Sequence, residues 1–222
     1  MDRYRETFNT WNKIAALYQD KFMDLDLYNE SYDFFCKAIP KKNATILDLG
    51  CGPGNISRYL LSQRPDFQLT GIDIAPNMIA LAKLNNPMAT FIEMDSRQIN
   101  TLATSFDGII CGFCLPYLSS SDCSKLIADA ALLLANNGIL YLSFVEGDGD
   151  QSGFQVGSDG DRVYFYYHPL EHLKQVLIDN HFAALKIFEV AYPKGKDTME
   201  IHHILIYRKK AAAKRLKTFG SL

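Results

Sequence analysis

Short apolar runs alternate with helical patterns through the middle of this chain, and no other feature restricts its fold as much. Runs typical of β-strands occupy residues 44–50, 67–74, 88–95, 106–113 and 139–147. Helical patterns fall between them, from residue 55 onward, at 75–86 and at 119–138. Strands that are apolar along their length and joined by helices are typical of a parallel sheet covered on both faces. The alternation therefore predicts an α/β fold with a doubly wound, mostly parallel sheet.

The two ends of the chain follow other patterns. Residues 3–40 read as helices, and Tyr32, Phe35, Cys36 and Ile39 form one apolar stripe at helical spacing. Near the other end, a helix over 168–182 precedes two strands over 184–192 and 200–209. The short segment 193–199 between those strands predicts an antiparallel hairpin. Residues 209–222 form a basic tail, which we expect to be solvated and frayed.

Charge and composition restrict the class of partner. The chain has 222 residues and a formal net charge of -2, so nothing favours nucleic acid as a partner. The charged start lacks the apolar region of a signal peptide, and no apolar run is long enough to span a bilayer. The five cysteines are scattered. We therefore expect a cytoplasmic protein that does not bind membranes. Oligomeric state is not encoded in any of these features.

A glycine-rich turn follows the first expected strand. It reads Gly50, Cys51, Gly52, Pro53, Gly54, and Asn55 begins a helix. The dinucleotide-binding pattern G-x-G-x-x-G differs, because here the third glycine comes one residue early and Pro53 has no N–H to offer a pyrophosphate. The turn therefore suits a ligand that approaches bare backbone, although three glycines can also simply make a tight turn.

Acidic residues follow the next two strands. Asp73 ends the second strand about 20 residues beyond the glycines, where a carboxylate can accept both hydroxyls of a ribose. Asp95 ends the third strand and is placed to meet an adenine edge. The carboxyl ends of parallel strands lie at one edge of the sheet, which is where open α/β sheets bind ligands.

Taken together, residues 43–146 resemble the class I S-adenosylmethionine-dependent methyltransferases, in their small-molecule branch. The segment ILDLGCGPGN is similar to the first motif of that family, GIDIAPNMI to the second, and MDS to the adenine-side motif. The segment FDGIICGFCLPYLS resembles the strand and loop under the methionine moiety. The resemblance implies a Rossmann-like seven-stranded sheet, helices on both faces, an antiparallel final hairpin and an N-terminal helical lid.

The same resemblance implies which residues hold the cofactor, S-adenosylmethionine, and its product S-adenosylhomocysteine. The cofactor-binding set would be Tyr18, Gly50, Cys51, Gly52, Gly54, Asn55, Asp73, Ile74, Met78, Asp95, Ser96, Cys111 and Phe113. Met78 can equally belong to a helical core stripe, and Tyr18 can simply pack on its helix. Tyr117, Tyr167 and His168 would line the acceptor pocket.

The family has no universal catalytic residue, so none is assigned, and no metal is expected. A base is needed only when the nucleophile arrives protonated, and His168 is then the first candidate. His202 and His203 lie next to each other in an expected strand. Their side chains would face opposite sides of the sheet, and we interpret both as structural.

The resemblance divides a single methyltransferase domain, 1–222, into four parts. These are a helical cap over 1–42, a cofactor-binding core over 43–146, an acceptor-side loop, helix and hairpin over 147–208, and the tail. The implied function is methyl transfer to a small-molecule acceptor by in-line displacement. Alternatives are a methylase of a protein or peptide, a non-catalytic S-adenosylmethionine-binding protein, or a nicotinamide-dependent oxidoreductase.

Two further motifs suggest other chemistry. Cys111 and Cys114 form a C-x-x-C pair, but the pair follows the fourth strand and lacks a second pair for zinc. Residues 148–159 match a calcium-loop pattern, with Asp159 where Glu is usual and with strands rather than helices expected on both sides. We therefore expect neither redox nor metal chemistry, and we interpret 148–159 as a polar, mobile connection near the mouth of the site.

Overall fold

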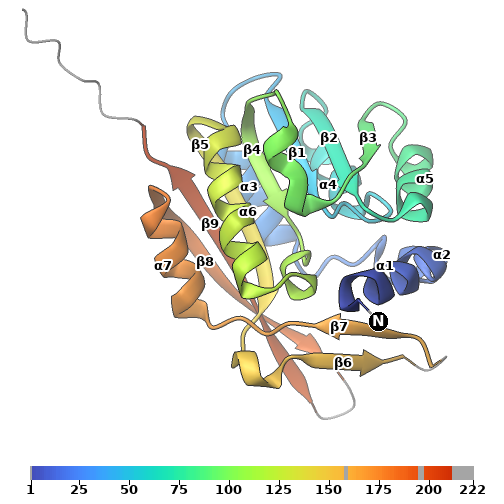
Figure 1. The fold of residues 1–222 in the computed structure, drawn as a ribbon. Coiled ribbons are helices and arrows are strands. Elements are labelled where there is room, and N and C mark those ends of the chain that lie inside the picture. Colours follow the sequence, from blue (N-terminus) through green and yellow to red (C-terminus); the bar gives the residue numbers. More distant parts are fainter. Residues whose placement is uncertain (1, 158–159, 195–197, 212–222) are drawn as a thin grey trace, which may run out of the picture.

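The computed structural model describes residues 2–157, 160–194 and 198–211. Its central sheet has seven strands in the order β3-β2-β1-β4-β5-β9-β8 (Figure 1). The strands are β1 (Thr45–Leu49), β2 (Gln68–Asp73), β3 (Thr90–Glu93), β4 (Phe106–Cys111), β5 (Leu134–Val145), β8 (Phe182–Pro193) and β9 (Met199–Lys209). The expected basic tail lies almost entirely outside the described residues.

Pairing directions follow the chain order of the strands. β1 pairs in parallel with β2 and β4, while β2–β3 and β4–β5 are also parallel. β9 runs antiparallel between β5 and β8. The prediction of a mostly parallel, Rossmann-like sheet with an antiparallel final hairpin is therefore confirmed.

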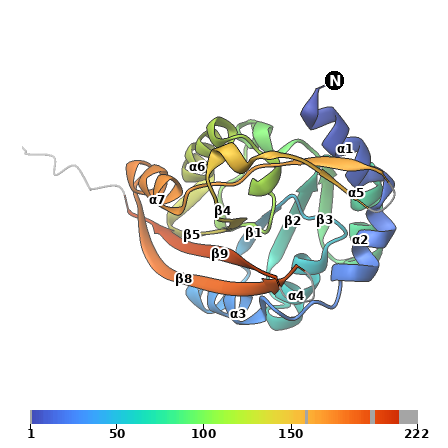
Figure 2. The ribbon, with the colours of Figure 1, turned by 90° about the horizontal axis from the view of Figure 1, so that it is seen from below.

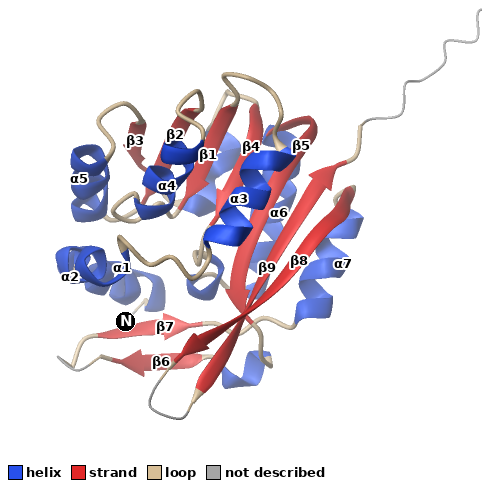
Figure 3. Ribbon diagram, turned by 180° about the vertical axis from the view of Figure 1, so that it is seen from behind, coloured by secondary structure: helices blue, strands red, loops and turns tan. Residues whose placement is uncertain are grey.

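Helices cover both faces of this sheet (Figures 2 and 3). On one face lie α3 (Asn29–Ala38), α4 (Asn55–Gln63) and α5 (Pro76–Asn85), and on the other lie α6 (Ser120–Leu133) and α7 (Leu170–Asp179). Neighbouring residues of β1 point to opposite sides, so Ile46 packs with the first group and Leu47 with the second. Both are fully buried. Burial on both faces is why these strands are apolar along their whole length.

The N-terminal helices α1 (Arg3–Lys13) and α2 (Ala15–Phe22) lie at the carboxyl ends of the strands (Figure 1). A second hairpin, β6 (Gly153–Val156) with β7 (Arg162–Phe165), lies against α1. The polar connection expected over 148–159 thus contains the short helix η3 (Gly149–Gln151) and one strand of this hairpin. Strand β6 forms because β7, rich in β-branched and aromatic residues, supplies its pairing partner.

None of the helices in the described part of the chain has the length and apolar character needed to cross a membrane.

Candidate cofactor and acceptor site

The glycine turn between β1 and α4 has a backbone that other residues adopt poorly. Gly50, Gly52 and Gly54 have φ angles of 64°, 53° and 80°. A Cβ atom at Gly50 would lie 2.9 Å from Cβ of Cys114, and one at Gly54 would lie 2.4 Å from Nδ2 of Asn86. Positive φ and close neighbours together require glycine at both positions. The turn is therefore packed tightly against Cys114 and Asn86, while Gly50 and Gly52 also border a cavity.

Asp73, at the end of β2, fixes this turn. Its Oδ2 accepts the Gly52 N–H at 3.0 Å, and its Oδ1 accepts the Ala75 N–H at 2.8 Å. Burial raises the pKa of the Asp73 carboxyl, while these backbone donors act in the opposite direction. Each carboxylate oxygen has two lone pairs. Asp73 can therefore hold the turn and still accept hydrogen bonds from a ligand in the cavity.

A second carboxylate, Asp48 in β1, lies behind the turn. It is fully buried, and its Oδ2 accepts the Ser57 hydroxyl at 2.6 Å. Its Oδ1 has no hydrogen-bond partner among the described residues. Burial, with a smaller contribution from the Asp73 charge, raises the pKa of Asp48 to about 7. Sequence reasoning passed over this residue because it lies inside an apolar run.

The end of β3 supplies the next part of the wall. Asp95 caps the short helix η1 (Ser96–Thr101) by accepting the Arg97 N–H at 2.9 Å, and the Arg97 guanidinium also contacts both carboxylate oxygens. Ser96 accepts a hydrogen bond from the Cys114 thiol at 3.6 Å. Asp95 and Ser96 both border the cavity, which places them on the same wall as Ile74 and Met78.

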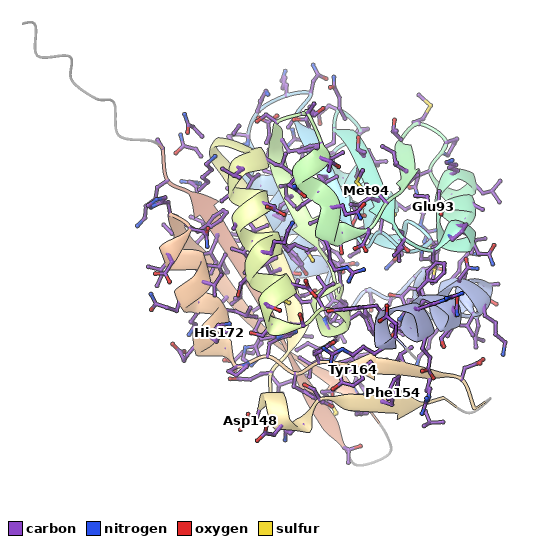
Figure 4. All side chains as sticks on the ribbon, viewed as in Figure 1. Glu93, Met94, Asp148, Phe154, Tyr164 and His172 are labelled. Carbon is purple, nitrogen blue, oxygen red and sulfur yellow. The ribbon has the colours of Figure 1, made fainter. Side chains whose placement is uncertain are left out.

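Helix α1 closes this cavity from the other side. Figure 4 labels Met94 after β3 and Tyr164 on β7, and α1 lies between them. This partly open space, called here the cofactor cavity, has a volume of about 130 Å³. The side of this cavity formed by α1 consists of Tyr4, Thr7, Phe8 and Trp11. The sequence predicted a lid but named Tyr18 of α2 within it, and only the tertiary structure shows which side chains of α1 point inward.

A network of contacts pins α1 to the β6–β7 hairpin. The Thr10 hydroxyl donates to the Arg162 carbonyl oxygen at 2.8 Å, and the Tyr164 N–H donates to the Thr7 hydroxyl at 2.9 Å. Arg162 also forms an ion pair with Glu6. The lid therefore has two parts, an N-terminal helix and a hairpin more than a hundred residues away in sequence.

A second cavity, of about 270 Å³, adjoins the cofactor cavity. The two share six wall residues: Trp11, Tyr18, Gly50, Gly112, Phe113 and Tyr117. Of these two cavities, Asn55 and Cys51 border only the second one. The Nε1–H of Trp11 is buried and has no hydrogen-bond partner among the described residues. An indole N–H can only donate, so this group fits a ligand acceptor placed where the cavities meet.

Most of the residues that the sequence singled out lie around these cavities. Tyr18, Gly50, Gly52, Asp73, Ile74, Met78, Asp95, Ser96, Phe113 and Tyr117 border the cofactor cavity. Gly54 and Cys111 lie behind the wall, where Cys111 is fully buried at the end of β4. Phe113 has a positive φ of 56°, and its N–H donates to the Ser143 hydroxyl at 2.8 Å. The Phe113 N–H is therefore already used in a hydrogen bond within the protein.

Two expected acceptor residues lie elsewhere. His168 is 1% exposed and borders neither cavity; its Nε2 lies 3.0 Å from the Leu115 carbonyl oxygen and 3.7 Å from Sγ of Cys123. Burial lowers the pKa of His168. Tyr167 does not border either cavity, although its hydroxyl lies 3.5 Å from Nε2 of Gln155, which borders the second one. The structure thus does not bring His168 to the site.

His202 shows the opposite outcome. The sequence interpretation made it structural, yet it borders the second cavity together with Tyr28, Tyr192, Lys194 and Glu200. No local signal distinguished it from His203, because strand periodicity gives two faces without saying which one meets a ligand.

The two remaining motifs are the C-x-x-C pair and the segment 148–159. Cys111 and Cys114 are free thiols, and Cys114 borders the cofactor cavity. Asp148 caps the helix η3, and Asp159 lies outside the described residues. Within the described ranges, no three His, Cys, Asp or Glu side chains gather as metal ligands would.

The strand order and the ligand-facing edge place this chain in the class of open, Rossmann-like α/β proteins. A family model described as a methyltransferase domain matches residues 46–138. A protein of Invertebrate iridescent virus 6 that carries the name "Putative methyltransferase 235L" is 30% identical over 217 residues, which are 88% of this chain and 76% of the relative. The carboxy-S-adenosyl-L-methionine synthase of Campylobacter hominis is 28% identical over 146 residues, 63% of this chain and 62% of the relative.

A solved structure has the same fold. The 1,6-didemethyltoxoflavin-N1-methyltransferase of Burkholderia thailandensis, crystallised with 1,6-didemethyltoxoflavin and S-adenosylhomocysteine, superposes with a TM-score of 0.69 at 20% identity. The alignment covers 93% of this chain and 88% of the other. The chain belongs to the class I S-adenosylmethionine-dependent methyltransferase family. It is thus a methyltransferase whose cofactor is S-adenosylmethionine.

Proposed function

We propose that this chain transfers the methyl group of S-adenosylmethionine to a small, largely apolar molecule held in the second cavity. The main observation in support of this proposal is that the two cavities share a wall of six residues. The lid beside them consists of α1 and the β6–β7 hairpin, which are joined by hydrogen bonds and an ion pair. Methyl transfer requires a donor and an acceptor in line with each other and shielded from water, and two adjoining cavities provide that arrangement.

In this proposal the nucleoside part of the cofactor would occupy the cofactor cavity. Asp73 would accept hydrogen bonds from the ribose diol, while Asp95 and Ser96 would lie at the adenine edge. Ile74 and Met78 would pack on the base. The methionine part would run past Gly50 and Gly52 toward Asn55, which borders the second cavity. The reacting methyl would then face the common wall near Trp11 and Tyr18, whose rings lie 5.4 Å apart.

The chemistry is displacement at a methyl group on a sulfonium, which is already a good leaving group. The chain's own residues then have to orient the acceptor and exclude water, and proximity of this kind can supply about 7–11 kcal/mol. The faces of Trp11 and Tyr18 would also stabilise the cationic sulfonium at short range.

The size of the acceptor space favours a small molecule over a peptide. A peptide acceptor would need an extended groove, whereas this cavity has a volume of about 270 Å³ and is bordered by Trp11 of α1 and by Gln155 and Phe165 of the β6–β7 hairpin. The solved relative named above was crystallised with 1,6-didemethyltoxoflavin, a small heterocycle. Both points support a small-molecule acceptor here.

The test uses S-adenosylmethionine carrying a labelled methyl group. The full chain would be incubated with it and with either the low-molecular-mass fraction or the protein fraction of a cell extract. We expect label to enter the low-molecular-mass fraction with equal release of S-adenosylhomocysteine. Label in protein would mean a protein or peptide methylase. Tight S-adenosylhomocysteine binding with no transfer in either fraction would favour a non-catalytic binding role.

A further inference from the structure

A chain of hydrogen bonds ends at the wall of the second cavity. The Tyr28 hydroxyl lies 2.7 Å from Nδ1 of His202, and Nε2 of His202 lies 3.3 Å from Oε2 of Glu200. Oε1 of Glu200 accepts a hydrogen bond from Nζ of Lys194 at 2.6 Å. All four residues border the cavity, and Tyr28 and His202 are each 6% exposed.

The partners of His202 fix its tautomer. Glu200 is paired with a lysine, so it is charged and can only accept hydrogen bonds. Nε2 of His202 must therefore carry the proton, which leaves a lone pair on Nδ1. The Tyr28 hydroxyl then donates to Nδ1, and the Tyr28 oxygen keeps lone pairs that can accept a further hydrogen bond.

Aromatic rings hold the imidazole in this orientation. The Tyr192 ring stacks on His202 at 4.8 Å with an interplanar angle of 13°, and the Phe113 ring lies 4.9 Å away. Phe113 is one of the six residues of the common wall, so the chain of hydrogen bonds lies beside the point where the two cavities meet. Tyr28 and His202 are the buried members of this network, while Glu200 is half-buried and Lys194 is exposed. Burying the polar groups of Tyr28 and His202 costs desolvation that an apolar wall would avoid.

We propose that Tyr28, His202 and Glu200 form a proton relay, and that the acceptor is a flat aromatic compound with a phenolic hydroxyl. The inference deepens, and rests on, the small-molecule methyl transfer proposed above. Aromatic side chains from six elements line the space, including Phe22, Tyr32 and Phe165. Acceptors that need no base, such as carboxylates or thioethers, would leave the relay without a function.

The phenolic oxygen forms a bond to the methyl carbon while the carbon–sulfur bond breaks and its electron pair stays on sulfur. The phenolic proton passes to the Tyr28 oxygen as the Tyr28 proton passes to Nδ1 of His202. The resulting imidazolium is stabilised by Glu200, as a carboxylate stabilises imidazolium in hydrolase triads. Tyr28 contacts the substrate directly, whereas His202 and Glu200 act through Tyr28.

The charge state at neutral pH suits this direction of transfer. Burial lowers the pKa of His202, and Glu200 opposes that effect. The titratable groups around His202 are Glu200, Lys194, Tyr28, Tyr192 and His203. His203 points to the other face of the sheet, where its Nε2 lies 2.8 Å from Oε2 of Glu146.

The test compares phenols that differ in acidity. A panel of simple phenols and naphthols, with aryl carboxylates and aryl thioethers beside them, is assayed for S-adenosylhomocysteine release. We expect the phenols and naphthols to be methylated, and Tyr28→Phe and His202→Gln to lower kcat for them by about 100-fold or more. A nitrophenol already ionised at the assay pH should lose less than about five-fold in the same variants, because it brings no proton.

His203→Gln is the matched control, since it changes the neighbouring histidine on the opposite face; it should leave kcat unchanged. In the wild type, kcat for the unionised phenols should rise with pH as His202 becomes neutral, and His202→Gln should abolish that rise. An equal loss for phenols and nitrophenol would make the network structural and overturn the relay. Turnover of carboxylates or thioethers but not phenols would overturn the acceptor class while leaving small-molecule methylation intact. Failure of every small molecule would instead count against the proposed function.

Discussion

Individual residues at this site are held by backbone geometry more than by side-chain pairing. The positive φ of Gly52 turns its N–H toward the carboxylate of Asp73, which accepts a hydrogen bond from it. Asp73 thereby shapes the turn and presents lone pairs to the cofactor cavity. Loss of the Asp73 carboxylate would remove both roles at once.

Asp73→Ala should weaken S-adenosylhomocysteine binding by about 1–3 kcal/mol, the scale of a lost charge-assisted hydrogen bond. Isothermal titration calorimetry measures this loss. Asp179→Ala, at the exposed end of α7, is the control and should bind as the wild type does. Equal affinity in the Asp73 variant would remove Asp73 from the site.

Asp48 leads to a prediction about stability and pH. Its pKa in the folded protein, about 7, lies above the ordinary value, so the folded state binds this proton more tightly than the unfolded state does. The corresponding stability is present at low pH and is lost as pH rises toward 7 and above. Asp48→Asn, which is neutral at every pH, should be more stable than the wild type at pH 8.5 by roughly 1–4 kcal/mol.

Urea unfolding of both proteins at pH 5 and pH 8.5 tests this expectation. The difference between wild type and variant should be small at pH 5 and larger at pH 8.5. If the difference in free energy of unfolding between wild type and variant is the same at pH 5 and pH 8.5, Asp48 keeps an ordinary pKa in the folded protein.

At the scale of elements, the lid joins segments that are far apart in sequence. Helix α1 contacts α5 through Asn12, whose Oδ1 accepts the Asn77 N–H at 2.9 Å, and β7 through Thr7 and Thr10. These contacts hold the only tryptophan of the chain, Trp11, between the two cavities. Its fluorescence therefore reports on ligand exchange and on lid movement.

Breaking the ion pair between α1 and β7 should loosen this lid. Glu6→Gln with Arg162→Gln should speed S-adenosylhomocysteine dissociation by about two- to five-fold, because an exposed pair contributes about 0.2–1 kcal/mol. Stopped-flow fluorescence of Trp11 gives the rate. Lys174→Gln, which breaks an exposed pair on α7, is the control. Dissociation as slow as in the wild type would show that the pair does not hold the lid closed.

For the whole molecule, the lid and the sheet are joined through a small apolar cluster. Both large core clusters meet the sheet, and Phe8 and Trp11 of α1 pack against a third cluster formed by Ala15, Ala75 and Met78. A ligand that contacts the glycine turn, η1 and α1 together therefore stabilises the whole folded state by mass action.

S-adenosylhomocysteine at a hundred times its Kd should raise the free energy of unfolding by about 2.7 kcal/mol. For a chain of this size that corresponds to a rise in Tm of about 5–10 °C, measurable by differential scanning fluorimetry. Calcium is the comparison, and we expect it to leave Tm unchanged. A saturable shift with calcium would reverse the interpretation of residues 148–159.

Local sequence determined the sheet, the glycine turn and the carboxylates that follow β2 and β3, because period, turn chemistry and strand-end position are properties of short segments. The tertiary structure alone decided which histidine borders a cavity. His168 lies beneath Leu115, while His202 borders the second cavity. It also paired β6 with β7 and set that hairpin on α1. The position of His202 beside Tyr28, and that of the hairpin on α1, depend on packing between segments more than a hundred residues apart. A strand's two-residue period gives two faces and no means of choosing between them.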